Sequence, residues 1–151
     1  MDQRHQIEEL VYRSSLALDE GNFKGFLDLC DDSFRYSITA YSPEIRKDMI
    51  WLDHDKSGMD TLFTNLPRHN SDHAPLTRHV TLYTVNGGGE RAEVVSALQV
   101  FRTELDGGET SLFAVGRYYD TIKLGAGAPK LLKRVVKMTT REMGAGYHIP
   151  F

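Results

Sequence analysis

The second half of the chain is a succession of long β-type segments separated by short glycine-rich turns. Strand-like runs cover residues 78–85, 90–104, 109–124 and 130–140, and the turns between them read NGGG, DGG and GAGAP. Glycine adopts the positive φ angles that tight hairpin turns require, so this order predicts an antiparallel meander.

Helical periodicity precedes the meander. Residues 5–20 carry an apolar stripe, and Asn22 is a typical N-cap for a second helix over residues 23–30. A third, short helix is expected over residues 58–66, ending before Pro67. The three predicted helices therefore lie on the N-terminal side of most of the sheet.

Between the second and third helices, residues 34–42 alternate apolar and polar side chains, which is typical of a strand. Helices followed by an antiparallel meander predict an α+β fold. We expect about three N-terminal helices to cover one face of a strongly curved antiparallel sheet, giving a cone. Residues 1–151 show no linker, repeat or low-complexity segment, which predicts a single domain.

Charge and composition exclude several classes of function. The chain has 151 residues and a formal net charge of -3, without a basic block, so nucleic-acid binding is not expected. No apolar run approaches the length of a membrane span, and the polar N-terminus does not resemble a secretory signal. A single cysteine, Cys30, favours a reducing compartment, so a cytoplasmic protein is predicted.

Two neighbouring strands carry apolar residues on both faces. An antiparallel sheet with one solvated face should alternate cleanly, and residues 94–101 and 112–119 do not. We expect the face away from the helices to contact another protein chain, through Phe101, Arg117 and Tyr119. Alternatively, the curvature of the sheet folds both faces inward.

The final segment, residues 144–151, reads GAGYHIPF. It is too rich in glycine for a helix, yet it carries Tyr147, Ile149 and Phe151. A disordered tail seldom has three such apolar anchors. We therefore expect it to dock against its own sheet or a neighbour, with Tyr147 and Phe151 as interface candidates.

The histidines do not predict a metal site. His69 and His73 have i, i+4 spacing, but they lie in a proline-flanked segment that is not expected to be helical. Three consecutive residues, Asp53, His54 and Asp55, point in different directions on either a strand or a helix. They are better explained as a junction between a strand and a helix, with Asp55 competing with a Ser57–Asp60 pair as the cap of that helix.

One catalytic alternative remains open at this point. A cone can enclose a pocket, and Tyr12, Tyr36, Asp53 and His79 are the residues that could face it. An Asp or His base with Tyr donors suits a stand-alone isomerase, cyclase or dehydratase. In the competing interpretation, Tyr36 and His79 simply fill the cone as core residues.

Several stretches, taken in order, resemble a known family. They are MIWLDHDKSGM, TRHVTLYTV, SALQVFRTE followed by FAVGRYYDTIK, and KLLKRVVKM. Together they are similar to the small (β) subunit of ring-hydroxylating, Rieske-type non-haem iron oxygenases, within the NTF2-like (cystatin-like) superfamily. The likeness runs from about Ile7 to Met138, and the final segment departs from the family pattern.

The resemblance implies a structural subunit of an oxidoreductase that is not catalytic by itself and has no metal or cofactor of its own. The Rieske [2Fe-2S] cluster and the mononuclear iron are expected in a large (α) partner that hydroxylates an aromatic or small sulfonate substrate. The family also implies self-association as a trimer, within a hexamer of three large and three small subunits.

Overall fold

The computed structural model describes residues 2–69, 72–140 and 150–151. The helices are α1 (Gln3–Asp19), α2 (Phe23–Asp28) and α3 (Lys56–His69). The strands are β1 (Cys30–Ser42), β2 (Lys47–Asp55), β3 (Leu76–Gly88), β4 (Arg91–Thr103), β5 (Thr110–Lys123) and β6 (Lys130–Met138). None of the described helices has the length and apolar character needed to cross a membrane.

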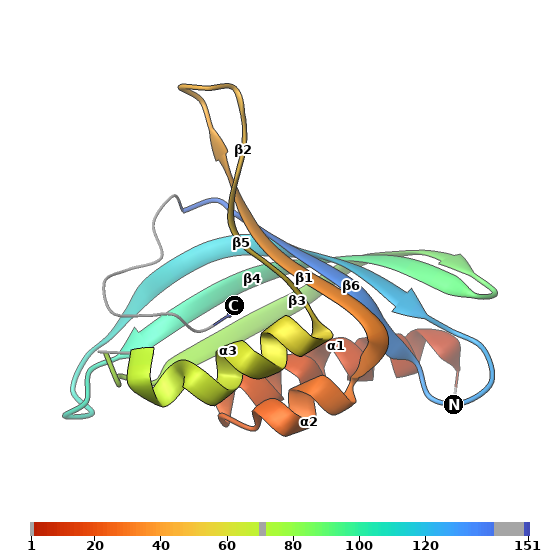
Figure 1. Ribbon diagram of the computed structural model, residues 1–151, viewed down its shortest axis with the longest axis horizontal. Helices are drawn as coiled ribbons and strands as arrows, with labels where there is room; N and C mark the ends of the chain where they lie inside the picture. The colour runs from red at the N-terminus through yellow and green to blue at the C-terminus, as the bar shows by residue number, and fades with distance from the viewer. Residues whose placement is uncertain (1, 70–71, 141–149) are drawn as a thin grey trace.

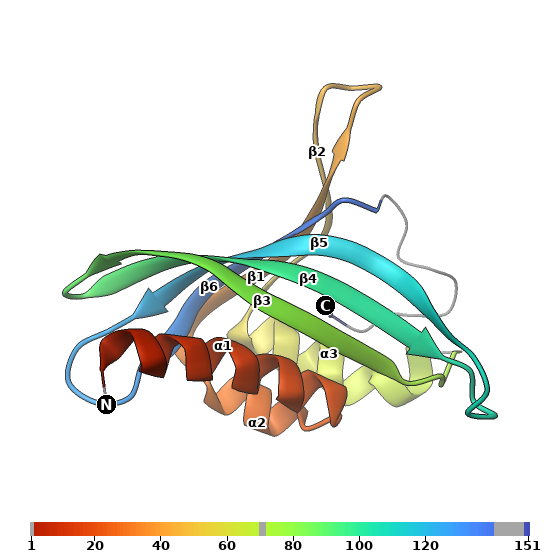
Figure 2. The same ribbon diagram turned by 180° about the vertical axis from the view of Figure 1, so that it is seen from behind.

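The six strands form one curved sheet in the order β2-β1-β6-β5-β4-β3. The three helices cover its concave side, as Figures 1 and 2 show from opposite directions. The predicted α+β cone is therefore confirmed. One pairing differs from the prediction, because β1 runs parallel to β6 whereas every other neighbouring pair is antiparallel. The chain between β1 and β6 contains β2, α3, β3, β4 and β5, and that long connection permits a parallel contact.

Side-chain caps set the starts of the helices. Asn22 accepts a hydrogen bond from the Gly25 backbone N–H at 3.0 Å, as predicted for the second helix. Asp55 accepts from the Gly58 N–H at 2.8 Å, so α3 begins at Lys56, two residues before the predicted start. This helix also passes through Pro67, where the prediction ended it. Proline removes one backbone donor, and near the end of a helix that loss is small enough to be tolerated.

The core lies between the helices and the concave face of the sheet. Along β1, Phe34, Tyr36, Ile38 and Ala40 are almost completely buried and alternate with more exposed residues, as predicted. The apolar stripe of α1 packs against the same core. The layer between helices and sheet is therefore filled with side chains.

Candidate functional site

A buried polar cluster lies in the interior of the cone. Asp120 on β5 and Arg134 on β6 are directly opposite each other in the strand register, and both side chains are inaccessible to solvent. Arg134 donates to Asp120 through Nε and a terminal nitrogen, at 2.7 and 3.0 Å. The same terminal nitrogen donates to the Ser14 hydroxyl of α1 at 2.9 Å, which joins the helix to the sheet.

The ion pair keeps Arg134 charged. Burial by itself lowers the pKa of Arg134, but the adjacent Asp120 carboxylate, together with Tyr118 and Tyr36, raises it above its ordinary value. The guanidinium also lies over the ring of Tyr118, with its central carbon 3.9 Å from the ring centroid. Burial raises the pKa of the Tyr118 and Tyr36 hydroxyls, so both remain protonated donors rather than bases.

A second buried arginine, Arg78 on β3, holds a segment from the end of the sequence. One of its terminal nitrogens donates to Asp19 of α1 at 2.8 Å. Its Nε donates to the Phe151 main-chain oxygen at 3.3 Å, and its other terminal nitrogen donates to the Pro150 oxygen at 2.8 Å. The Tyr118 hydroxyl also donates to the Phe151 oxygen. Phe151 is fully buried in its own domain.

The four residues of the catalytic alternative do not come together. Asp53 is exposed on β2, paired with Arg35 at 2.9 Å, and His79 is exposed on β3, beside the Phe101 ring. These two strands are the opposite edges of the sheet. Tyr12 is 43% exposed and accepts a hydrogen bond from the Leu82 N–H at 3.3 Å. Only Tyr36 faces the interior, where it is fully buried.

The Asp53-His54-Asp55 stretch is a junction between β2 and α3, as predicted. Asp53 pairs with Arg35, whereas Asp55 caps the helix, so the two carboxylates serve different partners. Within the described part of the chain, no three His, Cys, Asp or Glu side chains are grouped so that they could hold a metal ion. The side chain of His69 lies outside the described residues, so its predicted lack of pairing with His73 stays a prediction.

The convex face of the sheet carries the predicted interface residues. Arg117 is exposed and lies 5.6 Å from the ring centroid of Tyr83, and Lys137 lies 4.9 Å from that of Tyr119. Phe101 and Tyr119 are half-buried, and their strand neighbours Val100 and Tyr118 are fully buried in the core. Tyr147 lies outside the described residues. The face is a mixture of aromatic rings and cations, a composition favoured at protein interfaces.

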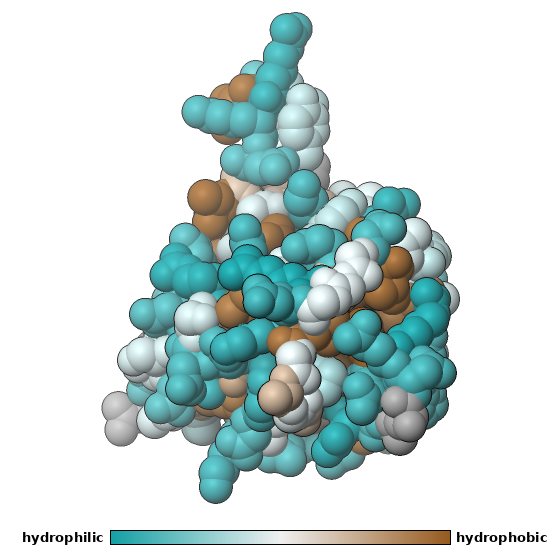
Figure 3. All heavy atoms as spheres, turned by 90° about the vertical axis from the view of Figure 1, so that its right-hand side faces the viewer, coloured by the Kyte–Doolittle hydropathy of each residue, from teal (hydrophilic) through white to brown (hydrophobic). Residues whose placement is uncertain are grey.

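A second exposed apolar surface was not predicted. The hairpin of β1 and β2 extends beyond the body of the protein (Figures 1 and 3). It carries Tyr41 and Ile45, each 54% exposed, and Ile50, 68% exposed. Arg46 turns the hairpin with a positive φ of 55°. The sequence shows these apolar residues but gives no indication that the strands carrying them leave the core.

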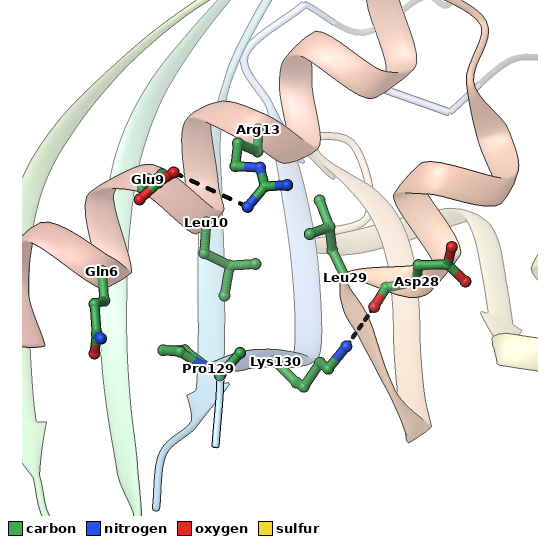
Figure 4. A pocket seen from close by; sticks show the side chains of 9 residues that line it. Gln6, Glu9, Leu10, Arg13, Asp28, Leu29, Pro129 and Lys130 are labelled. Atoms are coloured by element: carbon green, nitrogen blue, oxygen red, sulfur yellow. Dashed lines mark hydrogen bonds and ion pairs between the residues drawn. The ribbon is translucent and has the colours of Figure 1, made fainter. Parts of the chain in front are cut away.

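A groove on the helical side of the protein is lined by residues that do not form a catalytic site. It holds about 410 Å³ and lies between α1, the end of α2 and the turn before β6 (Figure 4). Its charged residues are engaged with nearby groups, since Arg13 pairs with Glu9 at 3.9 Å and Lys130 donates to the Asp28 main-chain oxygen at 2.5 Å. No nucleophile and base converge among these lining residues.

Comparisons with known proteins agree with this geometry. The model of the SnoaL-like domain family matches residues 1–135. The β subunit of the methanesulfonate monooxygenase hydroxylase of Methylosulfonomonas methylovora is 39% identical, over 99% of this chain and 87% of that protein. The β subunit of 2-aminobenzenesulfonate 2,3-dioxygenase of Alcaligenes sp is 32% identical, over 95% and 96% of the two chains.

The fold is also similar to a solved structure, that of the β subunit of a proposed aromatic-ring-hydroxylating dioxygenase from Novosphingobium aromaticivorans. The TM-score is 0.80, with 20% identity over 91% of this chain and 90% of that one. At this level of identity the likeness concerns the fold.

Proposed function

The chain belongs to the SnoaL-like domain family, and from that premise we propose that it is the small (β) subunit of a multicomponent hydroxylating oxygenase. The observation that carries the proposal is the 39% identity to a monooxygenase β subunit over 99% of this chain. In this role the chain stabilises a catalytic partner and does not perform the reaction itself.

The large (α) partner holds the Rieske [2Fe-2S] cluster and the mononuclear iron. A Rieske cluster is ligated by two cysteines and two histidines, and this chain has one cysteine, Cys30. Cys30 is also buried in the core, and burial raises the pKa of its thiol to about 12. The redox chemistry therefore belongs to the partner.

The substrate of the complex is a sulfonate. Both relatives are named for oxygenases of sulfonates, one aliphatic and one aromatic. The side chains that recognise the substrate belong to the large subunit, so this chain leaves the choice between the two classes open. The complex works in the cytoplasm.

Two surfaces make the subunit contacts. The convex face, with Arg117 and Tyr119, mediates self-association into a trimer, which supports three large subunits in a hexamer. The projecting hairpin, with Tyr41, Ile45 and Ile50, reaches another subunit of the complex. Exposed apolar groups of this kind lose unfavourable contact with water when a partner covers them.

Co-expression with the large subunit tests the proposal. We expect this chain to co-purify with the large subunit, and sulfonate hydroxylation to require both. The large subunit alone, and this chain alone, are the controls and should be inactive. A strict monomer that has no affinity for the large subunit, or hydroxylation at the full rate without this chain, would contradict the proposal.

A further inference from the structure

We propose that Asn86, near the end of β3, is a site of spontaneous deamidation, and that its conversion to aspartate or isoaspartate weakens the pairing of β3 with β4. Asn86 is followed directly by three glycines, in the NGGG stretch that leads into the turn of this hairpin. This site is independent of the subunit role proposed above.

The side chain of Asn86 is exposed and unengaged. Within the described part of the chain, its amide has no hydrogen-bond partner. The other two asparagines in the described ranges are in different surroundings. Asn22 accepts a hydrogen bond from the Gly25 N–H at 3.0 Å, as the cap of α2, and Asn65 lies within α3. Only the Asn86 amide is therefore both accessible to water and able to rotate toward its own backbone.

The residue after Asn86 presents its backbone nitrogen without a side chain beside it. Gly87 has a φ of 98°, a conformation that glycine adopts readily. A Cβ at this position would lie 2.8 Å from the Arg91 main-chain oxygen, so the hairpin needs glycine here. The backbone nitrogen that follows Asn86 is therefore the least hindered kind for an attack on the amide carbon.

Pairing with β4 is what holds this backbone in place. Asn86 is opposite Glu93 in the register, and the next two pairs toward the turn place Gly87 and Gly88 in β3. Glycine weakens a strand, and β3 is an edge strand with β4 as its one strand neighbour. The end of the hairpin should therefore open at little cost, which gives the backbone the freedom that ring closure requires.

The reaction needs only water and hydroxide. Hydroxide removes the proton from the Gly87 backbone nitrogen, which attacks the side-chain carbonyl carbon of Asn86. A carbon–nitrogen bond forms, ammonia leaves, and the product is a cyclic imide. One water then opens the imide. Breaking the bond to the side-chain carbonyl gives aspartate, and breaking the bond to the main-chain carbonyl gives isoaspartate.

Either product places a new carboxylate opposite Glu93. The Glu93 side chain is exposed on β4 and accepts a hydrogen bond from the Thr121 hydroxyl at 2.9 Å. Like charges directly opposite each other on neighbouring strands are destabilising. Isoaspartate also adds one carbon to the backbone, which disturbs the register toward the turn. Deamidation should therefore weaken this end of the hairpin.

The first test incubates the intact chain in mildly alkaline buffer and follows its peptides by mass spectrometry. We expect Asn86 to lose its amide and to give both products, faster as the pH rises, while Asn22 and Asn65 keep their amides. Asn86→Gln is the matched control, because its longer side chain does not form the same ring. Loss of the amide at Asn22 or Asn65 as fast as at Asn86, or an unchanged Asn86, would overturn the proposal.

A second variant tests the role of hairpin opening. Gly88 has no positive φ, and a Cβ added to it meets no atom within 4 Å, so Gly88→Ala fits the folded chain. At such a position alanine favours the folded conformation, so conversion of Asn86 should slow about two- to fivefold. An equal or faster rate in Gly88→Ala would show that opening of the hairpin does not limit the reaction.

The consequence for pairing is tested with Asn86→Asp, which reproduces one product directly. Its equilibrium constant for unfolding in urea should exceed that of Asn86→Gln by up to about fivefold, and the excess should vanish when Glu93→Gln is added to both. Equal stability of Asn86→Asp and Asn86→Gln in the presence of Glu93 would contradict the weakened pairing.

Discussion

Asp120 and Arg134 form an ion pair inside the protein, with 2.7 Å between Oδ1 and Nε and no solvent exposure of either side chain. Asp53 and Arg35 form a pair of similar length, 2.9 Å, on the surface, where each side chain is about half exposed. The two pairs have the same chemistry in different environments. Their contrast gives the first prediction.

Replacing Asp120 by Ala should lower the free energy of unfolding by about 3–5 kcal/mol, because it leaves the buried charge of Arg134 without compensation. The matched variant Asp53→Ala removes an exposed pair and should cost less than about 1 kcal/mol. Urea unfolding of both variants measures the difference. Equal costs would show that Asp120 is not buried as described.

Cys30 should make stability depend on pH in the alkaline range. Burial raises the pKa of its thiol to about 12 in the folded chain. Above the ordinary thiol pKa the unfolded chain has lost this proton and the folded chain has kept it, so stability falls as pH rises. The loss from this group is about 1.4 kcal/mol for each pH unit between the two pKa values. The urea midpoint of unfolding should therefore fall less between pH 8 and pH 10 for Cys30→Ala than for the intact chain. An equal fall in both proteins would contradict this prediction.

Deletion of residues 144–151 should destabilise the protein. Phe151 is fully buried, and removing a buried Phe side chain typically costs about 3–5 kcal/mol. Leu105→Ala is the control, since Leu105 is 70% exposed and its loss should change stability by less than about 0.5 kcal/mol. The measurements are the melting temperature and the mass of the assembly. No change in either would refute docking of the tail.

Arg117→Glu should weaken self-association through the convex face. The substitution removes the cation beside Tyr83 and places an acid among the interface residues, so the dissociation constant should rise about tenfold or more. Light scattering during gel filtration, over a range of concentrations, measures the change. Lys24→Glu on α2 makes the same charge change on the helical side and should leave assembly intact.

Ile50→Asp should weaken the contact made by the hairpin. Ile50 is 68% exposed, so the folded chain should lose less than about 0.5 kcal/mol, whereas a covered apolar contact is worth more than about 1 kcal/mol on truncation. Affinity for the large subunit, measured by biolayer interferometry, should fall about tenfold. Asp48→Asn on the same hairpin is the control. If Ile50→Asp binds as tightly as the intact chain, the hairpin is not a contact.

Local patterns predicted the elements well because their causes are local. The alternation of Phe34, Tyr36 and Ile38 gives the buried face of β1, and Asn22 and Asp55 cap helices within three residues of themselves. The prediction ended α3 too early, because a proline in the last turn removes only one backbone hydrogen bond and does not stop the helix. The family resemblance likewise depends on short stretches in a fixed order.

The candidate site could not be predicted in the same way. Asp53 and His79 were grouped because they share a chemistry, but the strand order places them on opposite edges of the sheet. The interior pairs join residues far apart in the sequence, as Asp19 and Arg78 or Ser14 and Arg134 do. In the sequence, a buried arginine cannot be distinguished from the arginines on the surface.

The sequence by itself determined the helices, the long strands, the glycine turns and the lack of cluster ligands, because propensity, periodicity and residue type act within a few positions along the chain. Only the tertiary structure decided that β1 lies parallel to β6, that Arg78 and Arg134 are buried, and that Phe151 occupies the cone. These outcomes depend on which distant segments exclude water together, and that is a property of the assembled core.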